Sequence, residues 1–168
     1  MGAGEMSKKY VLVGTGGRAE FFYGAMVRDF KDTCQLVAFC DVNQTRMDYS
    51  NSLLEEKYDH PQIATYLSSE FETMIAQEKP DIVIVTTVDR THHTYIIRAL
   101  ELGCDVITEK PMTIDAEKTQ EIIDAIKRTG QEVRVTLTIA TRRIIQKLEN
   151  LFETASLGMS IPLILNGH

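Results

Sequence analysis

The feature that most constrains this chain is a glycine-rich turn between an apolar strand and a helix. The strand is predicted at 9–14 (KYVLVG), and apolar residues at helical spacing predict the helix at 19–30. The turn that joins them consists of Gly14, Thr15, Gly16, Gly17, Arg18 and Ala19, a G-x-G-x-x-G/A pattern. Gly14 permits a tight turn, Gly16 lets a ligand approach the backbone, and Ala19 lets the helix pack closely on the strand. The free N–H groups at the start of such a helix favour a bound phosphate.

An acidic residue ends the second predicted strand, 35–41 (QLVAFCD). Asp41 lies 22 residues beyond Ala19, near the spacing of about 20 typical of the carboxylate that binds the ribose of a dinucleotide. This carboxylate can accept hydrogen bonds from the 2′ and 3′ hydroxyls and would repel a 2′-phosphate, so it predicts NAD as the cofactor. Arg46 lies nearby and would moderate that preference, which leaves NADP as the alternative. Without a ligand, the same residues are a tight strand–helix turn and a solvated acid.

Strands and helices alternate through the rest of the chain. Further strands are predicted at 64–67, 81–87, 105–108 and 132–138, and further helices at 45–58, 70–78, 91–102 and 115–129. Segment 81–87 (DIVIVTT) is apolar on both faces, as expected of a central parallel strand. Gly103 and Gly130 follow two of the helices and are predicted to cap them. The alternation predicts an α/β fold of the Rossmann type, with a doubly wound parallel sheet.

Charge and cysteine content exclude several classes of protein. The formal net charge of −6 does not favour a nucleic-acid or anionic-membrane partner, and no apolar run reaches the roughly 20 residues of a membrane span. The cysteines, Cys34, Cys40 and Cys104, are odd in number and include no C-x-x-C pair. They predict buried free thiols in a cytoplasmic protein, and no metal site is predicted.

A second group of polar residues follows the strands predicted at 81–87 and 105–108. Thr86 and Thr87 end the central strand and lead into Val88-Asp89-Arg90-Thr91-His92-His93, while Glu109-Lys110-Pro111 follows the next strand. In open α/β sheets, ligands bind outside the carboxyl ends of the strands. These residues are therefore expected at the same crevice as the glycine turn.

Together these motifs resemble the Gfo/Idh/MocA oxidoreductases, which include glucose–fructose oxidoreductase and inositol dehydrogenase. The resemblance rests on GTGGRA, D-V-N at 41–43, DIVIVTT, T-H at 91–92, A-L-E-L-G at 99–103 and E-K-P at 109–111. It covers about residues 9–136 and implies NAD(P)-dependent redox chemistry on the hydroxyl group of a small-molecule sugar or polyol.

The resemblance also implies roles for individual residues. Lys110 would be the catalytic residue that hydrogen-bonds the reacting oxygen, and Thr87, His92 and Glu109 would line the nicotinamide side of the site. Thr86, at the same strand end, is a candidate cofactor contact as well, and so is Lys110. Without the resemblance, Lys110 could equally be a surface lysine and His92 a polar residue at the start of a helix.

The sequence departs from the family after the last Rossmann strand. Family members continue into a second α/β domain, and a homo-oligomer is expected only where that domain is present. This chain instead reads LTIATRRIIQKLENLFETASLGMSIPLILNGH from residue 137. Restoring one base near codon 137 in a reverse translation gives Phe-Asn-Tyr-Arg-Tyr, the expected continuation, so 137–168 is interpreted as a frameshifted product. Its apolar stripe at 144–152 is compatible with a helix, and the segment from Ser156 onward is predicted to be poorly ordered.

We therefore divide the chain into an N-terminal extension (1–8), a dinucleotide-binding Rossmann domain (9–138) and an atypical tail (139–168) that lacks the family's second domain. The predicted function is that of the cofactor-binding domain of a sugar or polyol oxidoreductase, with the chain alone inactive. Two alternatives remain, a non-catalytic dinucleotide-binding or regulatory module and a non-functional truncated fragment.

Overall fold

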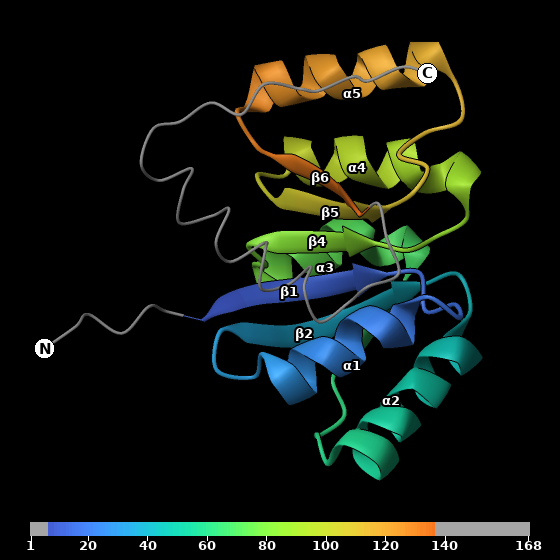
Figure 1. Cartoon of the computed structure of the whole chain (residues 1–168), viewed down its shortest axis with the longest axis vertical. Helices are drawn as coiled ribbons and strands as arrows, with labels where there is room; N and C mark the ends of the chain where they lie inside the picture. Colours follow the sequence, from blue (N-terminus) through green and yellow to red (C-terminus); the bar gives the residue numbers. More distant parts are fainter. Residues whose placement is uncertain (1–6, 137–168) are drawn as a thin grey trace, which may run out of the picture. The chain divides into compact units, whose positions relative to one another are not determined.

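Six parallel strands form one sheet at the centre of the structure (Figure 1). The computed structural model describes residues 7–136, so the predictions for 1–6 and for 137–168, including the helix at 144–152 and the segment from Ser156, lie outside it. The strands are β1 (Lys8–Val13), β2 (Cys34–Asp41), β3 (Ala64–Leu67), β4 (Ile82–Val85), β5 (Asp105–Glu109) and β6 (Val133–Thr136). Their order, β3-β2-β1-β4-β5-β6, is that of the doubly wound Rossmann fold and confirms the predicted fold class.

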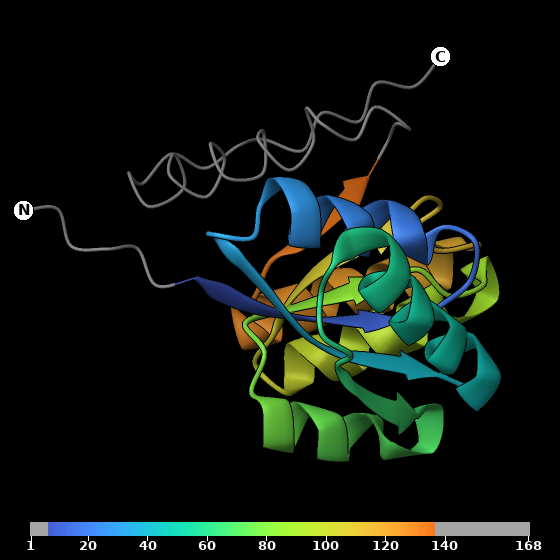
Figure 2. The ribbon, with the colours of Figure 1, turned by 90° about the horizontal axis from the view of Figure 1, so that it is seen from below.

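Helices cover both faces of this sheet. They are α1 (Ala19–Asp29), α2 (Gln44–Tyr58), α3 (Phe71–Glu78), α4 (His92–Glu101) and α5 (Ala116–Thr129), with short 3-10 turns at η1 (Ser68–Glu70) and η2 (Asp89–Thr91). Figure 2 shows α1 on one face and α3 on the opposite face. Because the strand order reverses between β1 and β4, a crevice opens between them at the carboxyl end of the sheet.

Alternating side chains of the central strands pack against these two helical layers. Val83 and Val85 of β4 belong to a fully buried cluster with Ile96 and Leu100 of α4, and α3 and α5 contribute to the same cluster. On the other face, the ring of Tyr23 in α1 meets that of Phe39 in β2 edge-on, with centroids 5.2 Å apart. Burial of apolar side chains on both faces stabilises the sheet and fixes the positions of its strand ends.

Local signals explain where the helices begin and end. The side chains of Asn43 and Asp115 cap α2 and α5 by accepting hydrogen bonds from main-chain N–H groups at 3.2 and 2.8 Å. Gly103 and Gly130 have φ angles of +82° and +75°, so the predicted glycine caps are confirmed. The predicted bounds agree within two residues wherever the structure describes them. The largest difference is at 81–87, where β4 ends at Val85 because Thr86 and Thr87 turn away to form the edge of the crevice.

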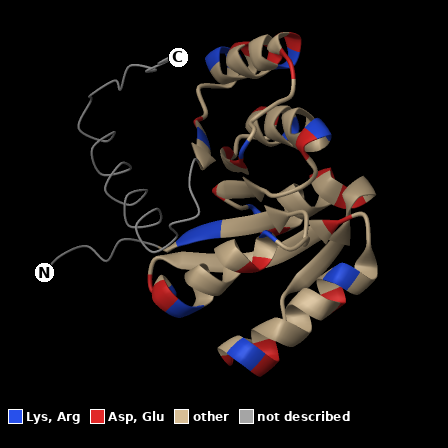
Figure 3. Cartoon of the chain, turned by 45° about the vertical axis from the view of Figure 1, so that its right-hand side comes forward, with Lys and Arg blue, Asp and Glu red and all other residues tan. Residues whose placement is uncertain are grey.

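Charged residues of both signs are interspersed along the helices (Figure 3). The three cysteines are buried and free, as predicted. Burial raises the pKa of the Cys40 thiol to about 12 and that of Cys104 to about 11. Within residues 7–136, no helix is long and apolar enough to span a membrane.

Candidate cofactor-binding site

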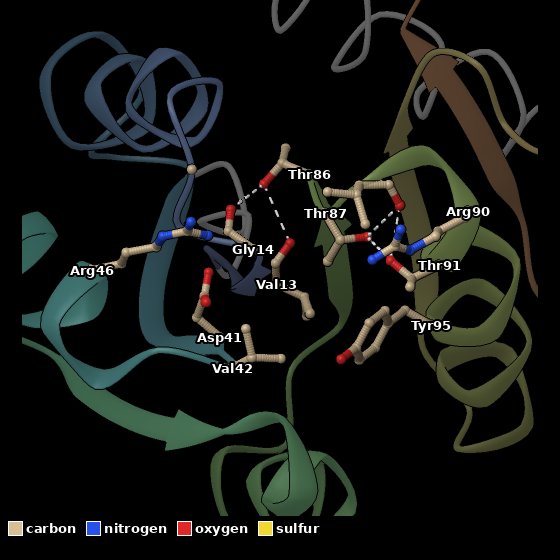
Figure 4. A pocket seen from close by; sticks show the side chains of 12 residues that line it. Val13, Gly14, Asp41, Val42, Arg46, Thr86, Thr87, Arg90, Thr91 and Tyr95 are labelled. Carbon is tan, nitrogen blue, oxygen red and sulfur yellow. Dashed lines mark hydrogen bonds between the residues drawn. The ribbon is translucent and has the colours of Figure 1, made fainter.

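A cavity of about 340 Å³ lies at the carboxyl ends of β1, β2 and β4, at the point where the strand order reverses (Figure 4). It is lined by Val13, Gly14, Gly16, Asp41, Val42, Arg46, Thr86, Thr87, Val88, Arg90, Thr91 and Tyr95. Five candidate cofactor-binding residues named from the sequence meet there, Gly14, Gly16, Asp41, Thr86 and Thr87, and Val88, Arg90 and Thr91 of the segment expected at the crevice join them. The topology of the sheet therefore brings the glycine turn, the acidic strand end and the threonine pair to one place.

At position 14, the backbone conformation and the packing of the protein require a glycine, independently of any ligand. Its φ is +95°, and a Cβ at this position would lie 2.7 Å from the main-chain nitrogen of Thr87. Real Cβ atoms do not approach backbone this closely, so a side chain would push β1 away from the end of β4. The hydroxyl of Thr86 donates to the carbonyl of Gly14 at 2.7 Å and reinforces this contact. Thr86 thus holds the turn and also lines the cavity.

Packing within the protein does not require a glycine at position 16, because the space beside Gly16 is open. A Cβ there would meet no atom within 4 Å, and its φ is not in the left-handed region. The helix that follows also differs from α2 and α5, because no side chain caps its start at Arg18. Gly17 and Arg18 are exposed and Ala19 is buried against the sheet. An open space beside uncapped N–H groups fits a diphosphate, which is the group that the dinucleotide would place there.

Asp41 is almost fully buried, with 5% of its surface exposed, and three hydrogen bonds from the chain fix its carboxylate. Oδ2 accepts from the main-chain N–H and the hydroxyl of Thr15, at 2.6 and 3.0 Å, and Oδ1 accepts from the N–H of Asn43 at 3.0 Å. A carboxylate has about four acceptor positions. Roughly one position on Oδ1 is therefore left for a ribose hydroxyl, and Thr15 acts mainly by holding Asp41.

Two arginines stand on opposite sides of the cavity, as Figure 4 shows. Arg46 extends from α2 and Arg90 from the turn before α4. Within residues 7–136, neither takes part in an ion pair, whereas the ion pairs found there join other residues. Two unpaired guanidinium groups around one acid give the cavity a positive balance of charge, which suits an anionic ligand.

Tyr95 forms the wall of the cavity below Arg90. Its ring packs edge-on against Phe71, with centroids 5.5 Å apart. Burial raises the pKa of the Tyr95 phenol, which therefore stays neutral and can donate a hydrogen bond. Two exposed valines, Val42 and Val88, lie at the mouth of the cavity, where an apolar base or ring would shield them from water.

The remaining predicted residues lie beside the cavity. His92 is the first residue of α4 and is buried, with its ring directed at main-chain carbonyls. Glu109 ends β5, the neighbour of β4, and its carboxylate accepts from the N–H of Lys110 at 3.2 Å. Lys110 is exposed. The cavity and Lys110 thus lie at the same edge of the sheet, one strand apart.

Sequence reasoning assigned no role to several residues of the cavity wall. Tyr95 belongs to no motif, whereas Val42 stands in the D-V-N motif and Val88 and Arg90 stand in the segment expected at the crevice. The positions of Val42 and Val88, just beyond the carboxyl ends of β2 and β4, are the signal that could have marked these two as cavity residues. Tyr95 lies in the first turns of α4, and its direction depends on how that helix packs.

Fold, strand order and cavity define a dinucleotide-binding Rossmann domain. The family model described as an oxidoreductase family with an NAD-binding Rossmann fold matches residues 8–137. The chain therefore belongs to the Gfo/Idh/MocA oxidoreductase family, and this domain is NAD-binding.

Several known proteins are similar to the chain. D-glucoside 3-dehydrogenase of Escherichia coli (strain K12) is 28% identical over 123 residues, which cover 73% of this chain and 32% of that protein. YteT of Bacillus subtilis (strain 168), an oxidoreductase by inference, is 26% identical over 95% of this chain and 37% of its own length. A crystal structure of the WlbA dehydrogenase from Chromobactrium violaceum, in complex with NADH and UDP-GlcNAcA, has a TM-score of 0.67 and 26% identity over 90% of this chain and 41% of that one. The chain thus spans about a third to two fifths of the length of these relatives.

Proposed function

We propose that the chain is the cofactor-binding part of an NAD(P)-dependent oxidoreductase that acts on a hydroxyl group of a sugar or polyol. The observation that carries the proposal is the cavity at the reversal of strand order, with Gly16 open to it and Asp41 fixed at its edge. The similar D-glucoside 3-dehydrogenase and the WlbA dehydrogenase, the latter bound to a nucleotide sugar, support a carbohydrate substrate.

Each part of the dinucleotide has a matching group in the chain. Asp41 would accept a hydrogen bond from the adenosine ribose through Oδ1, and the start of α1 at Gly16, Gly17 and Arg18 would hold the diphosphate. From there the second half of the cofactor would run along the ends of β4 and β5. Thr87 and Glu109 stand on that path, ahead of Lys110.

Oxidation of the hydroxyl group requires a hydride acceptor and a general base that removes the hydroxyl proton. Bound NAD supplies the acceptor. Lys110 can hydrogen-bond the hydroxyl oxygen through Nζ, polarise it and, in its neutral form, take its proton. The side chain is exposed and enters no ion pair within the described part of the chain, so no carboxylate there competes for it.

A turnover assay tests this function. The protein used should carry residues 1–136 followed by the second domain typical of the family, and it should be offered a panel of sugars, cyclic polyols and simple alcohols with NAD. NADH formation with a sugar or polyol, and little with simple alcohols, is expected. Tight NADH binding with no turnover on any of them would instead favour a non-catalytic dinucleotide-binding module.

A further inference from the structure

A buried imidazole joins the loop that lines the cavity to the segment that carries Lys110. His92 is 1% exposed. Its Nε2 lies 2.9 Å from the carbonyl oxygen of Thr87, a residue of the cavity wall, and its Nδ1 lies 2.7 Å from the carbonyl oxygen of Pro111. Thr87 and Pro111 follow neighbouring strands, β4 and β5, and are 24 positions apart in the sequence. A single side chain therefore spans the two loops.

The chemistry of the contacts limits what this ring can do. A carbonyl oxygen only accepts hydrogen bonds, so each contact needs an N–H on the imidazole. A ring with one N–H holds one loop, and a ring with two N–H groups holds both. In either case both nitrogens face main-chain oxygens, and neither is directed at the space where a cofactor or substrate would lie. The ring can therefore act on the reaction through position alone.

We infer that His92 is a positioning residue that sets the distance between the bound cofactor and Lys110. Its contact with Thr87 fixes the cavity wall, and its contact with Pro111 fixes the residue next to Lys110. Lys110 is exposed and its side chain has no ion pair within residues 7–136, so main-chain contacts restrain the position of the amine. The contact of His92 with Pro111 adds to the restraints from β5 and from the Glu109 carboxylate. The inference rests on the proposed role of Lys110 and assigns His92 a role other than direct contact with the nicotinamide.

The next residue provides a matched control. His93 also lies in the first turn of α4, but its Nε2 lies 3.3 Å from the hydroxyl of Thr94 and its Nδ1 has no hydrogen-bond partner within residues 7–136. Its charge acts on Asp115 at the start of α5 and on neither loop. Substitution of either histidine alters the same helix turn, and only that of His92 removes a link between the two loops. His92→Asn is the conservative variant, because its amide nitrogen can replace Nδ1 and keep the contact with Pro111.

Amide hydrogen exchange on the whole 168-residue chain tests the link without cofactor or turnover. His92→Ala should raise exchange in both 87–91 and 110–113, with protection elsewhere in the sheet retained. His92→Asn should restore protection in 110–113 but not in 87–91, and His93→Ala should leave both segments unchanged. If segments 87–91 and 110–113 exchange at the same rates in His92→Ala as in His93→Ala, the inference is overturned. This result does not depend on whether the chain binds a cofactor.

Kinetics in the longer protein that includes the second domain test the consequence for chemistry. His92→Ala should lower kcat roughly 10–100-fold, because a misplacement of about 1 Å can cost that much, while the Kd for NADH changes less than about threefold. His92→Asn should recover most of kcat. Equal losses in kcat and NADH affinity, with no recovery in His92→Asn, would show that His92 only supports the fold. If the unmodified longer protein shows no turnover, the proposed function is contradicted. The hydrogen-exchange test of the link through His92 is not affected by that outcome.

Discussion

Thr15 and Asp41 are joined by two hydrogen bonds to one carboxylate oxygen, at 2.6 Å from the main-chain N–H and 3.0 Å from the hydroxyl. This pair ties the glycine turn to the end of β2, so the acid that should hold the ribose and the turn that should hold the diphosphate form one rigid unit. Because charge-assisted hydrogen bonds are short and strong, this unit is set before any ligand binds.

The buried carboxylate of Asp41 should give a preference for NADH over NADPH. The 2′-phosphate of NADPH would stand against a fixed negative charge, and we expect NADH to bind about tenfold more tightly or better, equivalent to roughly 1.4 kcal/mol. Asp41→Ala should narrow this gap, with Arg46 then free to favour the phosphate. Fluorescence titration with both cofactors measures the ratio, and equal affinities in the unmodified chain would contradict the assignment.

Substitutions at Gly14 and Gly16 should affect different properties, the stability of the fold and the binding of NADH. Gly14→Ala places a Cβ against the backbone of Thr87 at a φ of +95°, and should lower the free energy of unfolding by about 1–3 kcal/mol. Gly16→Val meets no protein atom next to its Cβ, so the fold should survive while NADH binding is lost. Denaturant unfolding and NADH titration of both variants separate the effects. Undiminished NADH affinity in Gly16→Val would mean that no ligand occupies that space.

Lys110 should matter for chemistry far more than for binding. In a protein with the second domain present, Lys110→Ala should lower turnover by about 10²–10⁴-fold, the usual contribution of a general acid or base. NADH affinity should change little, since Lys110 lies outside the cavity. Steady-state kinetics and NADH titration on the same preparations provide the comparison. A loss of turnover below about threefold would remove Lys110 from the mechanism.

The buried thiols should make the fold sensitive to alkaline pH. Burial raises the pKa of Cys40 to about 12 and of Cys104 to about 11, above the ordinary value of 9.0. Unfolding lets both ionise at lower pH, so their contribution to stability is complete below pH 9 and is lost progressively as the pH rises from 9 to the folded-state values of about 11 and 12. The free energy of unfolding should fall above pH 9 by about 1.4 kcal/mol per pH unit for each thiol. Denaturant melts across this range measure it, and a native chain whose thiols react with a disulfide reagent at pH 8 as fast as a free thiol would contradict the burial.

The sequence was sufficient for the fold because each strand and each helix had its own local signal. Apolar runs, the glycine turn and the glycine caps at 103 and 130 determined the order of elements, and the acid at 41 was placed correctly at the edge of the cavity. Spacing alone could not show that Thr15 and Asn43 occupy most of the Asp41 carboxylate, because those bonds depend on how the turn approaches β2.

Contacts that depend on tertiary packing were harder to predict. The contacts of His92 with Thr87 and Pro111 depend on the register of β4 and β5, and the position of Tyr95 depends on the packing of α4. The frameshift interpretation of 137–168 stays a prediction. The B. subtilis relative aligns with 95% of the chain and hence with part of this segment, so the coding DNA around codon 137 is needed to decide it.

Titration of the purified 168-residue chain with NADH tests the central claim, that the cavity at the ends of β1, β2 and β4 is the cofactor site. The account predicts saturable binding at one site per chain, weakened in Asp41→Ala and abolished in Gly16→Val while circular dichroism shows an intact fold. A folded chain that does not bind NADH, or that binds it equally well in all three forms, would contradict it.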